Sequence, residues 1–408
     1  MHSILPGIDV LLANPPGWKN SRIGLVTNHA ACTASFKPVR QALLEAGFKI
    51  TRLFSPEHGL DTTGADGKEM QDGMDLLTGL PVTSLYGNKL APDEKDLAEI
   101  DLVLFDIPDI GCRFYTYLWT MTHVMEACAI HGKHLVIADR PNPLSGRLDL
   151  AEGPLLDERH CSSFIGRWNI PLRHSCTLGE LALYFKATGS SKILQANANS
   201  FPLEVIRCHN WQRTIFYPQW EYSFVPTSPA IPCFESALLY PGLGLLEAAN
   251  ISEGRGTATP FRIAGAPWMD GARVARLINE LCSSGVFARP VHFKPTEGKY
   301  AGQQCDGIML HVNDPSVFKP VWYGWLLIRL IKKLHPHFFS WAPYPTHVNY
   351  SGARHLDLLT GLKEAESLVA GSGENGIEDI ARYTDPGDWR NKVAPYLLYE
   401  PFANEQTN

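Results

Sequence analysis

The sequence predicts an α/β protein in which a Rossmann-like parallel sheet carries helices on both faces and is followed by a smaller α+β domain. Short apolar segments alternate with helical patterns over the first 145 residues, which is the order of a βαβ series. The apolar segments are β-branched or aromatic throughout, as is typical of strands buried on both faces. The pattern changes near residue 255, where an amphipathic helix, a strand and a long apolar helix follow.

The elements of the first domain follow one another in a regular order. Strands are expected at 22–27, 48–54, 80–86, 101–107, 133–139 and 203–208. Helical patterns occupy 36–47, 117–132 and 177–189. The first two end in glycine, the residue favoured just after a helix, and the third opens with the capping-box pair Thr177 and Glu180. Residues 60–80 form a loop rich in glycine and aspartate, and loops of this length are often functional.

The second domain is expected to be smaller, so that the chain divides into 1–255 and 256–408. A length of 408 residues favours two domains. The later segment predicts a helix within 270–285, a strand within 304–314 and a strongly apolar helix within 321–337, with further helix in the tail.

Composition excludes several classes of protein. With 45% hydrophobic and 19% charged residues the chain is typical of a soluble globular protein. A net charge of -6 and the lack of a basic run argue against nucleic-acid binding, and no apolar run is long enough to cross a membrane. Nine scattered cysteines indicate free thiols. Because the N-terminal segment lacks the features of a signal peptide, a cytoplasmic location is expected, or a periplasmic or secreted one if a signal peptide has been removed.

Polar side chains follow the expected strands of the first domain. They are Asn28, His29, Glu57, His58, Asp106, Asp109, Arg113, Asp139 and Arg140. The carboxyl ends of parallel strands meet at one edge of the sheet, where ligands bind, so these side chains are expected to converge there. Several have a simpler interpretation: a solvated turn for Glu57, structural histidines for His29 and His58, a shaped turn for Asp106 and Asp109, and an ion-paired support for Asp139 with Arg140.

The chemistry that fits this set is cleavage of a glycosidic bond. No G-x-G-x-x-G follows the first strand, and no Walker loop, H-E-x-x-H or G-x-S-x-G motif occurs. Carboxylates, imidazoles, arginines and aromatic residues remain, and they suit carbohydrate, since rings cover sugar faces and carboxyl groups serve as acid and base. The loop 250–257 adds Glu253 and Arg255 among glycines.

Several long motifs together resemble one family. They are "GLVTNHAA" (24–31), "LFSPEHGL" (53–60), "DIPDIGCRFYTYLWTM" (106–121), "DRPNPLSG" (139–146) and "ISEGRGTATPFRIAGAPWMD" (251–270). In this order, and over almost the whole chain, they resemble the exo-β-N-acetylmuramidases, which are peptidoglycan hexosaminidases. The resemblance implies an active site in the cleft between a Rossmann-like domain and a smaller C-terminal domain. It also implies hydrolytic release of non-reducing-end N-acetylmuramic acid (MurNAc) from MurNAc-β-1,4-GlcNAc chains.

The resemblance implies roles for individual residues. It makes Glu57 the best candidate for the catalytic carboxyl. The residues that match cleft-lining positions are Asn28, His58, Arg113, Tyr115 and Arg255. The chain departs from the family pattern at "PTSPAIP" (226–232), where Ala230 stands at a position expected to be asparagine.

We expect Glu57 to protonate the glycosidic oxygen, which requires a raised pKa, and a charged His58 beside it would oppose that. The second group stays open between Asp106, Asp109 and Glu253 as nucleophile or base, and the 2-acetamido group of the substrate itself. Arg113 or Arg255 is expected to bind the lactyl carboxylate. The reaction needs no metal or organic cofactor.

Two other functions fit the same residues. The first is a non-catalytic protein that binds muropeptides or sugars in the same cleft. The second is a metal-dependent hydrolase using His29, His58 and Asp106, which a chelator would inactivate, although no ligand spacing specifically supports it. In each interpretation the expected partner is a small carbohydrate, with neither nucleic acid nor membrane involved.

Overall fold

The computed structural model describes residues 3–281, 285–370 and 379–400. Its larger sheet has seven strands in the order β3-β4-β2-β1-β5-β6-β7. The strands are β1 (Ile23–Thr27), β2 (Ile50–Ser55), β3 (Gly73–Met74), β4 (Pro81–Ser84), β5 (Leu102–Asp106), β6 (His134–Ala138) and β7 (Leu203–Ile206). Every pair is parallel except β3 with β4 at one edge. The predicted Rossmann-like sheet is therefore confirmed.

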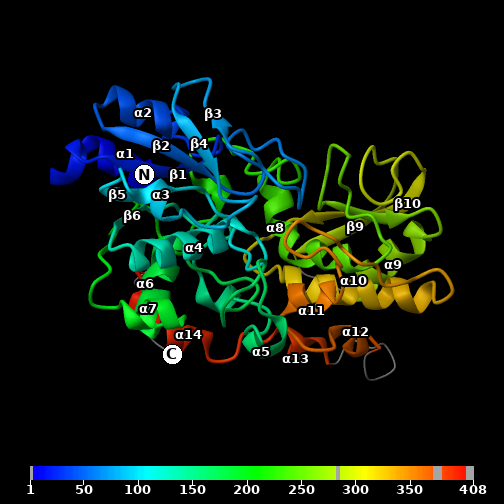
Figure 1. Cartoon of the computed structure of the whole chain (residues 1–408). Helices are drawn as coiled ribbons and strands as arrows, with labels where there is room; N and C mark the ends of the chain where they lie inside the picture. Colours follow the sequence, from blue (N-terminus) through cyan, green and yellow to red (C-terminus); the bar gives the residue numbers. More distant parts are fainter. Residues whose placement is uncertain (1–2, 282–284, 371–378, 401–408) are drawn as a thin grey trace.

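Helices cover both faces of this sheet (Figure 1). They are α1 (Gly7–Ala13), α2 (Val39–Glu45), α3 (Glu94–Leu97), α4 (Tyr117–Ile130), α5 (Glu158–Cys161), α6 (Leu178–Thr188) and α7 (Lys192–Ala196). Successive strand residues point to opposite faces. Leu25 and Leu53 pack with α1 and α2, whereas Val26 and Phe54 join the cluster that contains α4 and α6. Helix α6 begins as expected, because Thr177 accepts a hydrogen bond from the Glu180 amide.

The C-terminal part holds a three-stranded antiparallel sheet in the order β8-β10-β9. These strands are β8 (Ile263–Ala266), β9 (Val286–Phe293) and β10 (Cys305–Val312). The helices here are α8 (Phe234–Leu243), α9 (Gly271–Leu281), α10 (Pro320–Leu334), α11 (His355–Thr360), α12 (Ala365–Leu368), α13 (Ile380–Thr384) and α14 (Trp389–Val393). The smaller α+β unit is thus present, and the boundary at residue 255 stays a prediction. Sequence patterns did not reveal β8 or β9; β9 carries Pro290, which an edge strand tolerates.

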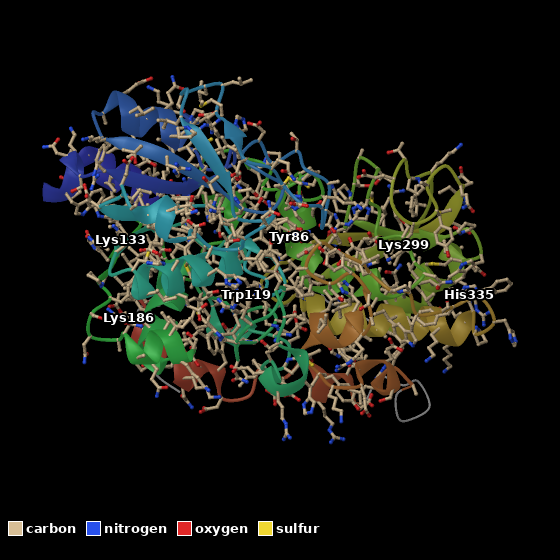
Figure 2. The ribbon with its side chains drawn as sticks, viewed as in Figure 1. Tyr86, Trp119, Lys133, Lys186, Lys299 and His335 are labelled. Carbon is tan, nitrogen blue, oxygen red and sulfur yellow. The ribbon has the colours of Figure 1, made fainter. Side chains whose placement is uncertain are left out.

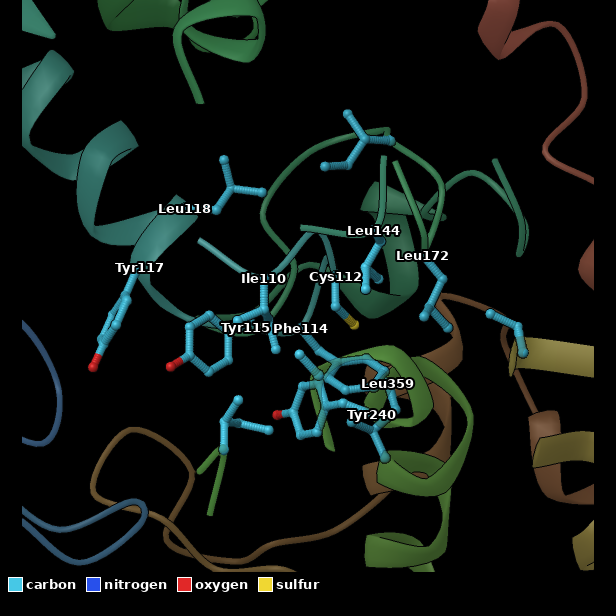
Figure 3. Packing of buried hydrophobic residues seen from close by; sticks show 14 of the residues in the cluster. Ile110, Cys112, Phe114, Tyr115, Tyr117, Leu118, Leu144, Leu172, Tyr240 and Leu359 are labelled. Carbon is cyan, nitrogen blue, oxygen red and sulfur yellow. The ribbon is translucent and has the colours of Figure 1, made fainter. Parts of the chain in front are cut away.

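One hydrophobic core continues from the large sheet into the C-terminal part. Figure 3 shows residues of the segment 110–118 packed against Tyr240 of α8 and Leu359 of α11. The Phe114 and Tyr240 rings lie 4.9 Å apart in an edge-to-face arrangement. This packing fixes the two parts of the molecule relative to each other, with Tyr86 at their junction (Figure 2).

The chain also returns to the first sheet at its C-terminal end. The Trp389 indole donates to the His174 carbonyl at 2.9 Å, and the Tyr399 hydroxyl donates to Asp139 at 2.6 Å. Eight cysteines are free among the described residues, and the ninth, Cys282, lies outside them. No helix in the described ranges is long and apolar enough to cross a membrane.

Candidate active site

A cavity lies where the carboxyl end of β2 meets the C-terminal part. It encloses about 580 Å³ of space not filled by atoms, part of which is open to solvent. Its polar lining residues are Glu57, His58, Asp66, Tyr86, Thr116, Ser228, Glu247, Arg255, Tyr344, Thr346 and His355. Aromatic and aliphatic side chains complete the walls, among them Tyr115 and Tyr240, and such mixed lining is typical of a small-molecule site.

Glu57 is a buried carboxyl held by two donors. It stands just after β2, where Pro56 ends the strand. Its Oε1 accepts a hydrogen bond from the Gly67 amide at 2.9 Å, and its Oε2 accepts one from the Thr116 hydroxyl at 2.7 Å. Burial raises the pKa of Glu57 and the nearby Asp66 carboxylate adds to the rise, which outweighs the opposing His58 charge and the two hydrogen bonds.

His58 is fixed in orientation by the loop that follows it. Its backbone adopts a left-handed conformation with φ of 67°, which turns the chain sharply after Glu57. The ring Nδ1 lies 2.8 Å from the Gly64 carbonyl oxygen, and because a carbonyl only accepts, Nδ1 carries the proton. A neutral His58 therefore keeps Nε2 as its unprotonated nitrogen.

Asp66 is the second carboxyl of the cavity, and sequence reasoning did not select it. One ligand atom each of Glu57, His58 and Asp66 lie within 4.8 Å of one another. The Tyr344 hydroxyl donates to Asp66 Oδ2 at 2.5 Å, and the Arg255 guanidinium lies 3.3 Å from Oδ1. Burial alone would raise the pKa of Asp66, but the Arg255 charge, His58 and the Tyr344 hydrogen bond together lower it. The glycine- and aspartate-rich loop 60–80 was the signal that could have pointed to it.

Arg255 organises the floor of the cavity. Its guanidinium lies 2.8 Å from Glu247, 3.2 Å from Glu253 and 3.3 Å from Asp66, and it also sits over the Phe261 ring. Three carboxylates thus share one cation, so Arg255 serves first to keep Asp66 ionised and in place.

His355 and Lys299 contact the carboxylates that surround Arg255. His355 Nε2 lies 3.3 Å from Glu247, and its ring stacks on Tyr344 with centroids 4.6 Å apart. Glu253 is buried beneath Arg255, does not line the cavity, and also pairs with Lys299 at 3.2 Å. Glu247, Tyr344 and His355 were not expected from the sequence, because their roles depend on contacts between distant segments.

The predicted residues divide into two groups. Glu57, His58, Tyr115 and Arg255 line the cavity, as does Ala230, which offers a methyl group where the family pattern suggests an amide. The residues that do not line it are Asn28, His29, Asp106, Asp109, Arg113 and Glu253.

Arg113 is a structural residue in this arrangement. It is completely buried and donates to the carbonyl groups of Pro154, Ile170 and Leu359. Burial among these neutral groups lowers the pKa of Arg113 to about 10. Its guanidinium therefore holds loops together and does not face the cavity.

The other strand-end residues also have local roles. Asp106 forms a buried ion pair with Arg140, so the support expected between Asp139 and Arg140 is replaced by this pair. Asn28 is buried and its Oδ1 accepts from the Ala30 amide, which shapes the turn after β1. His29 is exposed, so the structure does not gather it with His58 and Asp106 into a metal site.

Comparisons with known proteins identify the family of the chain. Models of exo-beta-N-acetylmuramidase NamZ match residues 23–235 for its N-terminal part and residues 238–399 for its C-terminal part. The chain is 39% identical over 336 residues to the peptidoglycan beta-N-acetylmuramidase NamZ of Bacillus subtilis (strain 168), covering 82% of this chain and 78% of that protein.

Two crystal structures share the fold. Both are DUF1343 family proteins from Bacteroides fragilis NCTC 9343. One has a TM-score of 0.84 at 30% identity and covers 98% of this chain and 99% of its own. The other has a TM-score of 0.74 at 27% identity and covers 98% of this chain and 100% of its own.

Proposed function

This chain belongs to the exo-β-N-acetylmuramidase NamZ family, and we propose that it removes the terminal MurNAc of MurNAc-β-1,4-GlcNAc in the cavity around Glu57. It is a glycoside hydrolase of peptidoglycan, and its substrate is a carbohydrate. A cytoplasmic location stays a prediction, as does the absence of nucleic-acid and membrane partners.

One observation carries the mechanism: of the three carboxyl groups that line the cavity, Glu57 and Asp66 lie close together but differ in their surroundings. Glu57 has a raised pKa and Asp66 a lowered one, and the oxygens of the two groups lie within 4.8 Å of each other. A pair of titratable groups whose environments push their pKa values apart is the usual arrangement of an acid and its ionised partner. Glu57 is accordingly the general acid, and Asp66 is the ionised carboxylate.

In the first step, Glu57 transfers its proton to the glycosidic oxygen as the bond from that oxygen to the anomeric carbon breaks. A separation of about 5 Å between carboxyl groups is typical of retaining glycosidases, whereas inverting ones need about 6.5–9.5 Å to hold a water molecule. Asp66 then either attacks the anomeric carbon or stabilises the 2-acetamido group as that group attacks. Water completes the second step, and Glu57 takes the proton from it.

Of the two arginines expected at the lactyl carboxylate, Arg255 is the one that lines the cavity. Its charge is already shared by Asp66, Glu247 and Glu253. A lactyl carboxylate at Arg255 would therefore gain less binding free energy than it would at a guanidinium with no other partners. Part of the selectivity for MurNAc must then come from other contacts.

The test is the variant Glu57→Gln, assayed on MurNAc-GlcNAc, because a sugar leaving group needs the proton that a chromogenic leaving group can do without. Loss of the general acid should reduce turnover by about 10²–10⁴-fold while the protein stays folded. Glu69→Gln is the matched control, because Glu69 is an exposed glutamate of the neighbouring loop. Near-normal turnover by Glu57→Gln would refute the assignment, and a wild-type protein that binds MurNAc-GlcNAc without cleaving it would favour the sugar-binding alternative.

A further inference from the structure

Glu57, His58 and Asp66 form a cluster with the composition of a metal site, which we name the carboxylate–histidine cluster. It lines the cavity around Glu57, called the Glu57 cavity from here on. One ligand atom of each residue lies within 4.8 Å of those of the other two. Zn²⁺ accepts imidazole nitrogen and carboxylate oxygen, and three protein ligands with a water molecule are the usual set at an open zinc site. The cluster therefore offers the kind and number of ligands that this ion takes.

His58 presents the nitrogen atom that a metal ion requires. In the neutral ring, Nδ1 carries the proton and donates it to the Gly64 carbonyl oxygen at 2.8 Å, which leaves Nε2 unprotonated. Within the described ranges, no hydrogen bond or ion pair engages Nε2. The residue is 6% exposed and lines the cavity. A backbone carbonyl that fixes the tautomer in this way is the usual second partner of a metal-binding histidine.

Both carboxyl groups of the cluster are held by donors that leave lone pairs for a further partner. Glu57 accepts hydrogen bonds from the Gly67 amide and the Thr116 hydroxyl. Asp66 accepts one from the Tyr344 hydroxyl. Since a carboxylate offers about four lone-pair sites, each group can bind a cation without losing these hydrogen bonds. Outer donors of this kind orient the carboxylate ligands of metal sites.

The separation of the ligand atoms suits a zinc ion after a small movement. Ligand atoms at about 2.0–2.2 Å from a tetrahedral zinc ion lie about 3.4 Å from each other. At the limit of 4.8 Å, each atom of the cluster must move about 0.8 Å towards their common centre, which is comparable to the thermal displacement of an ordered side chain. Mg²⁺ and Ca²⁺ prefer about six to eight oxygen ligands, so one imidazole with two carboxylates favours zinc.

The charges around the cluster also favour a cation. Arg255 contacts three carboxylates, of which Asp66 is one, and another of them pairs with Lys299 as well. Three negative groups thus face two positive ones, which leaves one negative charge in excess, and ionisation of Glu57 adds a second. A cation bound at the cluster neutralises this excess, so the presence of Arg255 does not exclude it.

We propose that the carboxylate–histidine cluster binds Zn²⁺ and that the bound ion inhibits hydrolysis. The inference rests on the proposed function, which makes Glu57 the general acid. When zinc binds, the proton of Glu57 passes to solvent and the carboxylate oxygen coordinates the ion in its place. Glu57 then has no proton for the glycosidic oxygen, and the ion stands between Glu57 and Asp66, where the bond is cleaved. Zinc is thus an inhibitor that competes with substrate, not a cofactor.

The first experiment measures the inhibition constant of Zn²⁺ for hydrolysis of MurNAc-GlcNAc, with Mg²⁺ as the control cation. Chelator-treated wild type should be active, and zinc should raise its KM while kcat stays the same. In His58→Asn the amide can still donate to Gly64, and asparagine suits the φ of 67°, but Nε2 is lost. Relative to its own zinc-free rate, this variant should need at least about tenfold more zinc for the same inhibition.

His160→Asn is the matched control. The His160 ring is exposed and lies 2.7 Å from the Asp157 carboxylate, so it offers a histidine and a carboxylate outside the cavity. Its inhibition constant for zinc should equal that of the wild type. Equal inhibition of wild type and His58→Asn, or inhibition that lowers kcat and leaves KM unchanged, would overturn the proposal.

The second experiment detects the site without activity, by the visible absorption of Co²⁺ as a substitute for zinc. Wild type and His160→Asn should show the bands of a four-coordinate ion, whereas His58→Asn and Asp66→Asn should not. No bands in the wild type would overturn the proposal. So would an enzyme that a chelator inactivates and zinc restores, because the ion would then be a cofactor. Failure of the proposed function is a distinct result: metal-free wild type would leave MurNAc-GlcNAc intact, and the Co²⁺ spectrum would still decide whether the cluster binds metal.

Discussion

Glu57 and Asp66 have the same functional group and share one cavity, but their neighbours differ. Glu57 receives hydrogen bonds from an amide and a hydroxyl, which do not offset the cost of burying its charge. Asp66 receives a hydrogen bond from Tyr344 and lies beside the Arg255 cation, which do offset that cost. In the proposed mechanism, the division of roles between acid and carboxylate therefore depends on two residues of the C-terminal part, Tyr344 and Arg255.

Removal of the Tyr344 hydroxyl should change the pH dependence in a defined direction. Asp66 must be ionised, so kcat/KM falls as the pH drops through its pKa, whereas Glu57 must be protonated, so kcat/KM falls as the pH rises through its pKa. Tyr344→Phe deletes the hydrogen bond that lowers the pKa of Asp66, and the acidic limb should move to higher pH while the alkaline limb stays.

The measurement is a pH profile of kcat/KM for wild type and variant on MurNAc-GlcNAc, whose sugar leaving group needs protonation by Glu57. Tyr350→Phe is the control, because Tyr350 is near Tyr344 in the sequence but is 79% exposed and does not line the cavity. An acidic limb that stays in place, or that moves to lower pH, would contradict the role given to Asp66.

At this scale the sequence revealed residues whose roles follow from their own segment. Glu57 was predicted from the strand that ends just before it together with the family resemblance of "LFSPEHGL", and it does line the cavity, while its catalytic role stays a prediction. Asp66 was not predicted, because Arg255 and Tyr344, which keep it ionised, are far away in the chain. Arg113 was one of two arginines expected at the lactyl carboxylate, and no sequence pattern shows that three carbonyl groups converge on it instead.

Among the elements, the loop 344–349 controls the position of the acid. The His347 amide donates to the Gly67 carbonyl, and the His347 ring donates to the Gly87 carbonyl, both at 2.8 Å. Gly67 in turn donates its amide hydrogen to Glu57. Its φ of 65° suits glycine, and a β-carbon there would lie 2.9 Å from the Thr346 side chain.

The substitution Gly67→Ala should therefore lower kcat/KM strongly, since the clash with Thr346 displaces the amide that holds Glu57. Gly79→Ala is a matched control: Gly79 has a φ of 70°, so it has similar backbone strain, but a β-carbon there meets no atom within 4 Å. Both variants should lose about 1–2 kcal/mol of stability from the backbone conformation. Equal activity of the two variants, measured on the same substrate, would contradict the proposed coupling of this loop to the acid.

Elements were predicted well wherever one local pattern decided them. The six predicted strands of the large sheet and the helices α2, α4 and α6 occur where apolar runs, glycine ends and a capping box placed them. Strand β9 was missed because its exposed face and Pro290 hide the pattern. The course of the loop 344–349 was not predictable, because contacts with the other part of the chain determine it.

Across the whole molecule, the C-terminal segment joins the end of the chain to the first sheet. Asp139, just after β6, is fully buried and accepts hydrogen bonds from Tyr399, Thr177 and the Gly179 amide. Burial raises the pKa of Asp139 to about 6 in spite of these hydrogen bonds. The folded protein therefore binds this proton more tightly than the unfolded chain, in which the pKa is about 3.9.

The free energy of unfolding therefore depends on the protonation of Asp139. The contribution of Asp139 is complete below the unfolded-state pKa and is lost as the pH rises through about 6. Asp139→Asn should remove this part of the decline in the free energy of unfolding between pH 4 and pH 7, measured by urea unfolding. Asp61→Asn, at an exposed aspartate, should leave the decline unchanged. Identical slopes in wild type and Asp139→Asn would contradict the prediction.

Fold class and the family were predictable at this scale because the strand–helix order and the long motifs are local in sequence. The Glu57 cavity was predictable only as a cleft between two parts. The set of residues that line it, which includes Glu247, Tyr344 and His355, depends on how α8, α11 and the loop 344–349 pack against the first sheet.

The central claim is that Glu57 and Asp66 act together on one glycosidic bond. The most direct test is the configuration of the MurNAc first released from MurNAc-GlcNAc, followed by proton NMR before mutarotation. One oxygen of each carboxyl group lies within 4.8 Å of the other, which is closer to the separation of about 5 Å in retaining glycosidases than to the roughly 6.5–9.5 Å of inverting ones, so β-MurNAc should form first. Initial release of α-MurNAc would mean inversion, and would contradict the role of Asp66 in this account.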